Sequence, residues 1–296
     1  MSADRLQDRL VEHYALCGAA LRESDRDRWL ACLFAPEAAQ PHLFALYAFN
    51  AEVARIRDHV SQPILGEMRL QWWIDALDSV DGGEPRGDLR AHPVADALLA
   101  TIESRALPRQ LLLEVLEARR FDLYEDPAPD MAFLDRYCDE TCAALFALAA
   151  RIVRADPAGN AMAEDSLSLA ARHGGRAYAI VGLLRALPWH VAQRRCYLPE
   201  DVLARHGLTP GAVFARGNKA AVAAVLAEMR ALARDNLAKA KQGVSSLSES
   251  DREAFRLLAL PELYLRVMER RDYDPYETLV DVPLWRRQWA LWRNKF

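Results

Sequence analysis

The chain has 296 residues, which is enough for one large domain or for two. Hydrophobic residues make up 52% of it and only 13 residues are glycine, a composition typical of a globular protein with a large core. The formal net charge of −4 is mild and gives no electrostatic reason to expect a protein that binds nucleic acid. Five cysteines without C-x-x-C spacing indicate a reducing compartment rather than a disulfide framework.

The N-terminal segment, residues 1–16, has neither the apolar stretch of a signal peptide nor the acid-poor composition of a transit peptide. No run in the chain approaches the roughly 18 apolar residues that a transmembrane helix needs. We therefore expect a cytoplasmic protein whose membrane contact is peripheral, on the inner face of the membrane.

Helical spacing of apolar residues and helix-boundary residues predict a series of helices and no strand, since β-branched residues never alternate over a useful length. A loop is predicted over residues 81–93, which are rich in glycine and proline. The fold class is therefore all-α, and we expect residues 1–296 to form a single domain, a compact helical bundle. In chain order the predicted helices cover 6–21, 25–33, 36–62, 64–80, 94–104, 108–123, 131–153, a long helix from 157 kinked at Pro188, 219–242, one capped within 245–250, 261–271 and 283–295.

Residues 177–199, AYAIVGLLRALPWHVAQRRCYLP, place Gly182, Ala186 and His190 on one helical face, because side chains four residues apart align along a helix. This stretch resembles the second signature of the squalene/phytoene synthase family, in which N-x-x-R-D-x-x-x-D runs into R-x-Y-L-P. The two aspartates of that signature are replaced by Ala186 and His190 here. The matching residues are Arg185, Arg195, Tyr197, Leu198 and Pro199.

Residues 44–61, FALYAFNAEVARIRDHVS, resemble the first signature, an aromatic-rich helix that ends in D-x-x-x-D. Ala54 replaces the first aspartate and Asp58 keeps the second, so one carboxylate remains of the four that hold Mg²⁺ in the family. The R-A-x-P-x-H pattern of residues 185–190 resembles the non-catalytic branch typified by the assembly factor of complex I, the NADH:ubiquinone oxidoreductase.

The resemblance implies an isoprenoid synthase-type helical bundle with a central cavity. A single aspartate cannot build the oxygen-rich coordination that Mg²⁺ requires, so we expect no metal and no catalytic residues. Three interpretations stay open. The chain is an assembly factor or scaffold for membrane-complex subunits such as those of complex I; or it binds an isoprenoid diphosphate or phospholipid; or it is a divergent head-to-head prenyltransferase, which would need Mg²⁺.

Arginines are the candidate ligands for phosphate in place of a metal, since a guanidinium binds two oxygens at once. The alternative is that these arginines are solvated or pair with acids such as Glu52, Asp58 and Asp75. The candidate residues for a ligand are Arg55, Arg57, Arg69, Arg185, Arg194 and Arg195, with Tyr47, Tyr197, Phe44, Phe49, Trp72 and Trp73 as walls of an isoprenoid tunnel or as ordinary core.

The C-terminal segment, VPLWRRQWALWRNKF, places Trp285, Trp289, Trp292 and Phe296 on one helical face. Basic residues occupy the rest and no acid lies between Leu284 and Phe296. An interfacial helix has this composition, but an aromatic stripe that closes a bundle has the same spacing. The candidate membrane contacts are Trp285, Arg286, Arg287, Trp289, Trp292 and Arg293.

Overall fold

The computed structural model describes residues 3–79, 92–154 and 161–293. In these ranges the chain is built from helices joined by turns and contains no strand, which confirms the all-α prediction. None of the described helices has both the length and the apolar composition needed to cross a bilayer.

The chain forms two compact units. Unit 1 comprises Met1–Tyr124, Ala147–Gly159 and Ser248–Ala254, and unit 2 comprises Glu125–Phe146, Asn160–Leu247 and Phe255–Phe296. The prediction that residues 1–296 form one domain stays a prediction.

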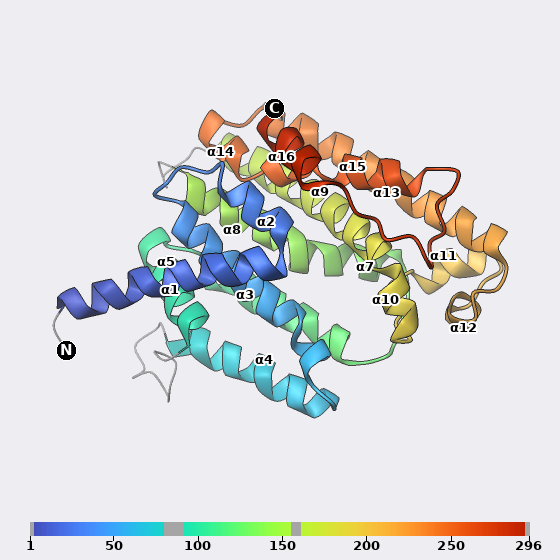
Figure 1. The fold of residues 1–296 in the computed structure, drawn as a ribbon, viewed down its shortest axis with the longest axis horizontal. Coiled ribbons are helices and arrows are strands. Elements are labelled where there is room, and N and C mark those ends of the chain that lie inside the picture. Colours follow the sequence, from blue (N-terminus) through green and yellow to red (C-terminus); the bar gives the residue numbers. More distant parts are fainter. Residues whose placement is uncertain (1–2, 80–91, 155–160, 294–296) are drawn as a thin grey trace. The chain divides into compact units, whose positions relative to one another are not determined.

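Unit 1 is built around α1, α3 and α5, which pack against one another (Figure 1). The Tyr14 hydroxyl lies 3.0 Å from His42 Nδ1 and 3.1 Å from Thr101 Oγ1, so one polar cluster joins the three helices. Burial lowers the pKa of His42 to about 4. The helices of this unit are α1 (Ala3–Ser24), α2 (Arg26–Cys32), α3 (Gln40–Ala54), η1 (Ile56–His59), α4 (Pro63–Asp78), α5 (Pro93–Arg105), α6 (Arg109–Ala118), η4 (Arg119–Leu123), most of α8 (Ala144–Val153) and α14 (Glu249–Glu253).

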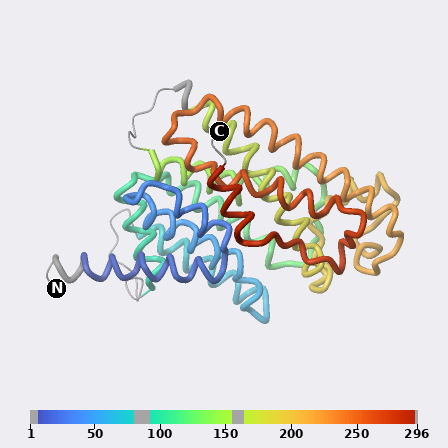
Figure 2. Tube along the Cα trace, turned by 45° about the horizontal axis from the view of Figure 1, so that its top comes forward, coloured from blue at the N-terminus to red at the C-terminus, as the bar shows by residue number. Residues whose placement is uncertain are grey.

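Unit 2 is organised by two long helices, α9 (Ala161–Arg185) and α13 (Lys219–Ser245), which run alongside each other (Figures 1 and 2). His173 Nδ1 lies 2.8 Å from Asn236 Oδ1 between them. A Cβ atom at Gly175 of α9 would lie 2.3 Å from the backbone nitrogen of Ala143, so only glycine permits this approach. The other helices are α7 (Met131–Cys138), the π-helical η5 (Asp139–Ala143), α10 (Leu187–Ala192), α11 (Glu200–Arg205), α12 (Pro210–Phe214), η6 (Arg256–Ala259), α15 (Pro261–Met268) and α16 (Leu284–Arg293).

Most predicted helices are present, and their differences from the prediction concern boundaries. The helix predicted over 36–62 is shorter, since α3 begins at Gln40 and ends at Ala54. The helix predicted over 131–153 contains the π-helical η5, and the one over 108–123 ends in the 3-10 segment η4. The short helices α11, α12 and η6 were not predicted. The loop predicted over 81–93 lies outside the described residues except for His92 and Pro93, where α5 begins.

All five cysteines are buried and none forms a disulfide. Burial raises the pKa of the Cys17 thiol to about 12 and that of Cys196 to about 11. Cys138 and Cys142 are both buried and pack as small apolar side chains, as the sequence indicated.

Candidate functional site

The first signature lies in unit 1, and its helix ends earlier than the sequence suggested. Arg55 follows α3 with φ −101° and ψ 1°, and the amide of Asp58 then donates to the Arg55 carbonyl at 3.0 Å. That bond spans three residues, so Asp58 belongs to the 3-10 segment η1 and not to the α-helical register of Ala54. The prediction that Ala54 and Asp58 share one helix is therefore wrong.

The second signature lies in unit 2 and keeps its helical alignment. The amide of Ala186 donates to the Gly182 carbonyl and that of His190 to the Ala186 carbonyl, both at 3.0 Å. The break falls at Ala186, between α9 and α10, because Pro188 has no amide hydrogen and its ring would clash with a carbonyl one turn earlier. The predicted kink is thus present, two residues before the proline.

The residues at the four signature positions do not fit a magnesium cluster. Asp58 alone carries a carboxylate, and Asp58 is exposed on η1. In the described ranges no group of three or more His, Cys, Asp or Glu side chains could hold a metal ion. Mg²⁺ binds through oxygen atoms in octahedral geometry, and Ala54, Ala186 and His190 supply none of the side-chain oxygens it needs. The expectation that the protein holds no metal stays a prediction.

His190 is half-buried and packs against an aromatic side chain. Its ring centroid lies 4.5 Å from that of Tyr197, which is buried. Both residues line a cavity of about 10 Å³ in unit 2, which is at the lower limit for one water molecule. This cavity has no room for an isoprenoid chain.

Most of the predicted phosphate ligands are engaged with their own unit. The guanidinium carbon of Arg185 lies 3.6 Å from the ring centroid of Tyr264, a fully buried side chain. Arg57 donates to the carbonyl of Val60 at 3.3 Å. Arg194 lies over Phe214, Arg195 is half-buried, and Tyr47 is buried beneath Arg28.

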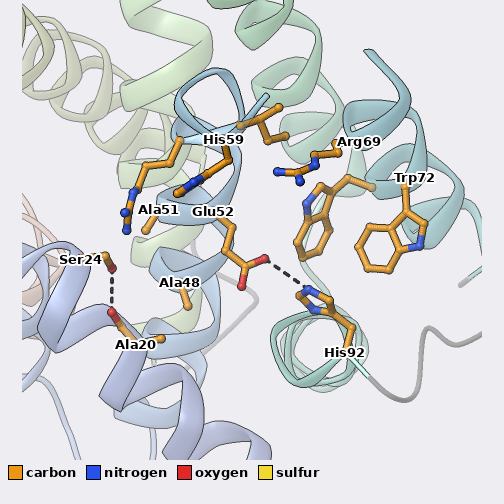
Figure 3. Close-up of a pocket in the computed structure, with 12 residues that line it drawn as sticks. Ala20, Ser24, Ala48, Ala51, Glu52, His59, Arg69, Trp72 and His92 are labelled. Carbon is orange, nitrogen blue, oxygen red and sulfur yellow. Dashed lines mark hydrogen bonds and ion pairs between the residues drawn. The ribbon is translucent and has the colours of Figure 1, made fainter. Parts of the chain in front are cut away.

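A pocket of about 500 Å³ lies in unit 1 (Figure 3). One face of α3, continued by η1, forms a wall, and α1, α4 and the start of α5 form the others. Four predicted residues meet there: Arg55, Arg69, Trp72 and Trp73. The other lining residues are Ala20, Ser24, Ala48, Ala51, Glu52, Ile56, His59 and His92.

Glu52 and His92 face each other across this pocket (Figure 3). His92 caps α5, where its Nδ1 accepts a hydrogen bond from the Ala95 amide at 3.3 Å. Its Nε2 therefore carries the proton and lies 3.6 Å from Glu52 Oε2. Burial raises the pKa of Glu52 to about 7 and lowers the pKa of His92.

The pocket combines positive charge with an aromatic wall. Arg55 and Arg69 bring two guanidinium groups, while Glu52 is partly protonated near neutral pH and offsets them incompletely. The rings of Trp72 and Trp73 meet edge to face with centroids 5.0 Å apart. Such a lining suits an anion that carries an apolar or planar body.

Sequence reasoning missed the role of His92 in this site. His92-Pro93 at a helix start signals a cap, which places the ring at the end of α5. Nothing in the sequence shows that this end of α5 faces Glu52 on α3.

The predicted membrane contacts lie on α16 in unit 2. Trp285, Trp289 and Trp292 are exposed, as are Arg286 and Arg293. Arg287 is buried and lies 3.6 Å from Asp281, so its assignment as a membrane contact is corrected. Phe296 lies outside the described residues.

Comparisons with known proteins agree with the resemblance seen in the signatures. Complex I assembly factor 6 of Bos taurus is 27% identical over 92% of this chain and 81% of its own length. A 15-cis-phytoene synthase of Synechococcus elongatus is 24% identical over 95% of this chain and 92% of its own. A crystal structure of a dehydrosqualene synthase has a TM-score of 0.79, with 17% identity over 97% of this chain and 96% of the other, and shows the shared fold.

The family model described as squalene/phytoene synthase matches residues 21–293, and this range spans both units and both signatures. The chain therefore belongs to the squalene/phytoene synthase family.

Proposed function

We propose that this chain is a non-catalytic member of its family that acts as an assembly factor or scaffold for a membrane complex such as respiratory complex I. The observation that carries the proposal is the similarity, over nine-tenths of the chain, to proteins named as complex I assembly factor 6. The loss of three signature carboxylates, at Ala54, Ala186 and His190, supports it, because diphosphate ionisation needs stabilisation of the charge that develops.

In this proposed role the protein works in the cytoplasm, in peripheral contact with the inner face of the membrane. Five buried free thiols suit a reducing compartment.

The test is a quantitative pull-down of the tagged chain from its native host after cross-linking, beside an untagged control. Complex I subunits should be enriched. Enrichment of isoprenoid enzymes without those subunits would contradict the assembly role.

A second assay addresses catalysis directly. The purified chain, with Mg²⁺ and farnesyl or geranylgeranyl diphosphate, should form neither presqualene nor prephytoene diphosphate. Turnover at the rate of a family synthase assayed alongside would make it a prenyltransferase and overturn the non-catalytic assignment.

The pocket of unit 1 favours a second candidate function, the binding of an isoprenoid or phospholipid anion. This function is supported by the lining of the pocket, which brings Arg55 and Arg69 together with the wall formed by Trp72 and Trp73. Lipid extracted from the purified protein and identified by mass spectrometry should be anionic, and the Arg55→Gln/Arg69→Gln variant should retain much less of it. Equal lipid content in both proteins would exclude this pocket as the binding site.

A further inference from the structure

The C-terminal helix α16 exposes an unusual amount of aromatic surface. Trp285, Trp289 and Trp292, here called the tryptophan stripe, are 62%, 55% and 58% exposed. At 100° per residue their side chains point within about 60° of one another. Since large apolar side chains gathered on a surface usually mark a contact site, the stripe needs a partner.

The opposite side of α16 holds the helix on unit 2. Leu291 is fully buried, and its carbonyl accepts a hydrogen bond from Arg256 Nη1 at 2.8 Å. Arg287, on this same side, is 9% exposed and lies 3.6 Å from Asp281. The helix is thus fixed in rotation, so the exposure of the stripe follows from the packing of its other face.

Positive charge accompanies the stripe. Arg286 and Arg293 are exposed, and the guanidinium carbon of Arg286 lies 5.1 Å from the ring centroid of Trp285. The segment from 282 to 296 contains no acidic residue, although the whole chain carries a net charge of −4. No acidic residue lies on α16, the helix that exposes these three tryptophans.

We propose that the tryptophan stripe, with Arg286 and Arg293, binds the surface of an anionic lipid bilayer. Indole rings settle at the depth of lipid headgroups, where their apolar body and their N–H group are both accommodated. Each cation near an anionic leaflet contributes roughly a fivefold gain in binding. The charge of α16 is complementary to that surface, and the helix lies along it without crossing it.

The inference rests on the peripheral membrane contact included in the proposed function. It is tested on the purified full chain alone, so its failure leaves the assembly role untouched. The assay is co-sedimentation with vesicles of phosphatidylcholine mixed with phosphatidylglycerol, and with vesicles of phosphatidylcholine only. Binding to the mixed vesicles should weaken steeply as salt is added, because exposed charges are screened.

Two variants separate the contributions. Arg286→Gln/Arg293→Gln should weaken binding on the order of 20-fold. Trp289→Ser should reduce the blue shift that tryptophan emission undergoes on vesicle binding, since Trp285 and Trp292 remain on the stripe. The matched control, Arg270→Gln/Arg271→Gln, removes two exposed arginines that follow α15 and should bind as the parent does. Circular dichroism should show that each variant keeps its helical fold.

The parent chain's failure to sediment with the mixed vesicles at low salt would overturn the proposal. Equal weakening in the control variant would also overturn it, because binding would then follow overall charge. If the parent does not bind vesicles while the α16 variants lose their protein partners in a pull-down, the stripe is a protein-docking surface instead.

Discussion

Glu52→Gln should stabilise the protein in a pH-dependent way. The pKa of Glu52 is raised by burial from 4.5 to about 7, so the folded state binds more protons than the unfolded state between these values. Stability contributed by the protonated acid is therefore present below pH 4.5 and is lost as the pH rises through about 7. Glutamine keeps the shape of the protonated acid and never ionises, so the variant does not suffer this loss.

The pKa change would correspond to about 3 kcal/mol if it were fully expressed in stability. However, 39% of the Glu52 side chain is exposed, and water screens its charge. We therefore expect the variant to gain about 1 kcal/mol at pH 8 and almost nothing at pH 4.5. Such a gain raises the Tm of a chain of this size by about 2 °C.

The assay is thermal unfolding followed by circular dichroism at both pH values, with Glu12→Gln, an exposed acid on α1, as the matched control. A Tm difference that is equal at the two pH values, or a variant less stable than the parent at pH 8, would refute the burial argument.

Two more predictions concern unit 2. Gly175→Ala should lower the free energy of unfolding by about 2 kcal/mol, because the new Cβ would strike backbone atoms at the end of η5. Gly182→Ala in the same helix meets nothing within 4 Å and should be neutral or stabilising in the same denaturant titration. Arg176 binds both carboxylate oxygens of Asp139 at 2.7 Å and one of Asp135 at 2.6 Å. Arg176→Met should destabilise the protein at pH 7 much more than at pH 3, because burial raises the pKa of Asp135 above 3.8 and protonation of Asp135 at low pH relieves its repulsion with Asp139. An equal loss at both pH values would show that packing, and not charge, is what the arginine provides.

The sequence predicted those helices whose first residues carry a recognisable cap or proline. Asp25 caps α2 by accepting from the amide of Arg28, and Pro63 opens α4. The end of α3 at Ala54 was not predictable, because residues 55–62 contain no helix-breaking residue. The π-helical η5 also has no signal in the sequence. It ends at Ala143, the residue whose backbone Gly175 approaches closely.

The candidate site was predictable in its residue types but not in its arrangement. The sequence singled out Arg55, Arg69 and Trp72, which do line one pocket. It could not show that Arg185 stacks on Tyr264, because these residues are far apart in the chain and meet only in the folded unit. Protonation behaviour such as that of Glu52 depends on burial and is invisible in a sequence.

Unit 1 is discontinuous along the chain, and this affects how it can fold during synthesis on the ribosome. Its first segment ends at Tyr124, but it also includes Arg154 and Asp251, whose side chains are buried and joined at 3.0 Å. These partners are 97 residues apart, so the nascent N-terminal helices wait for most of the polypeptide to emerge before their unit is complete. Residues 1–124 expressed alone would lack this pair. A fragment that represents unit 1 must therefore include all three of its segments.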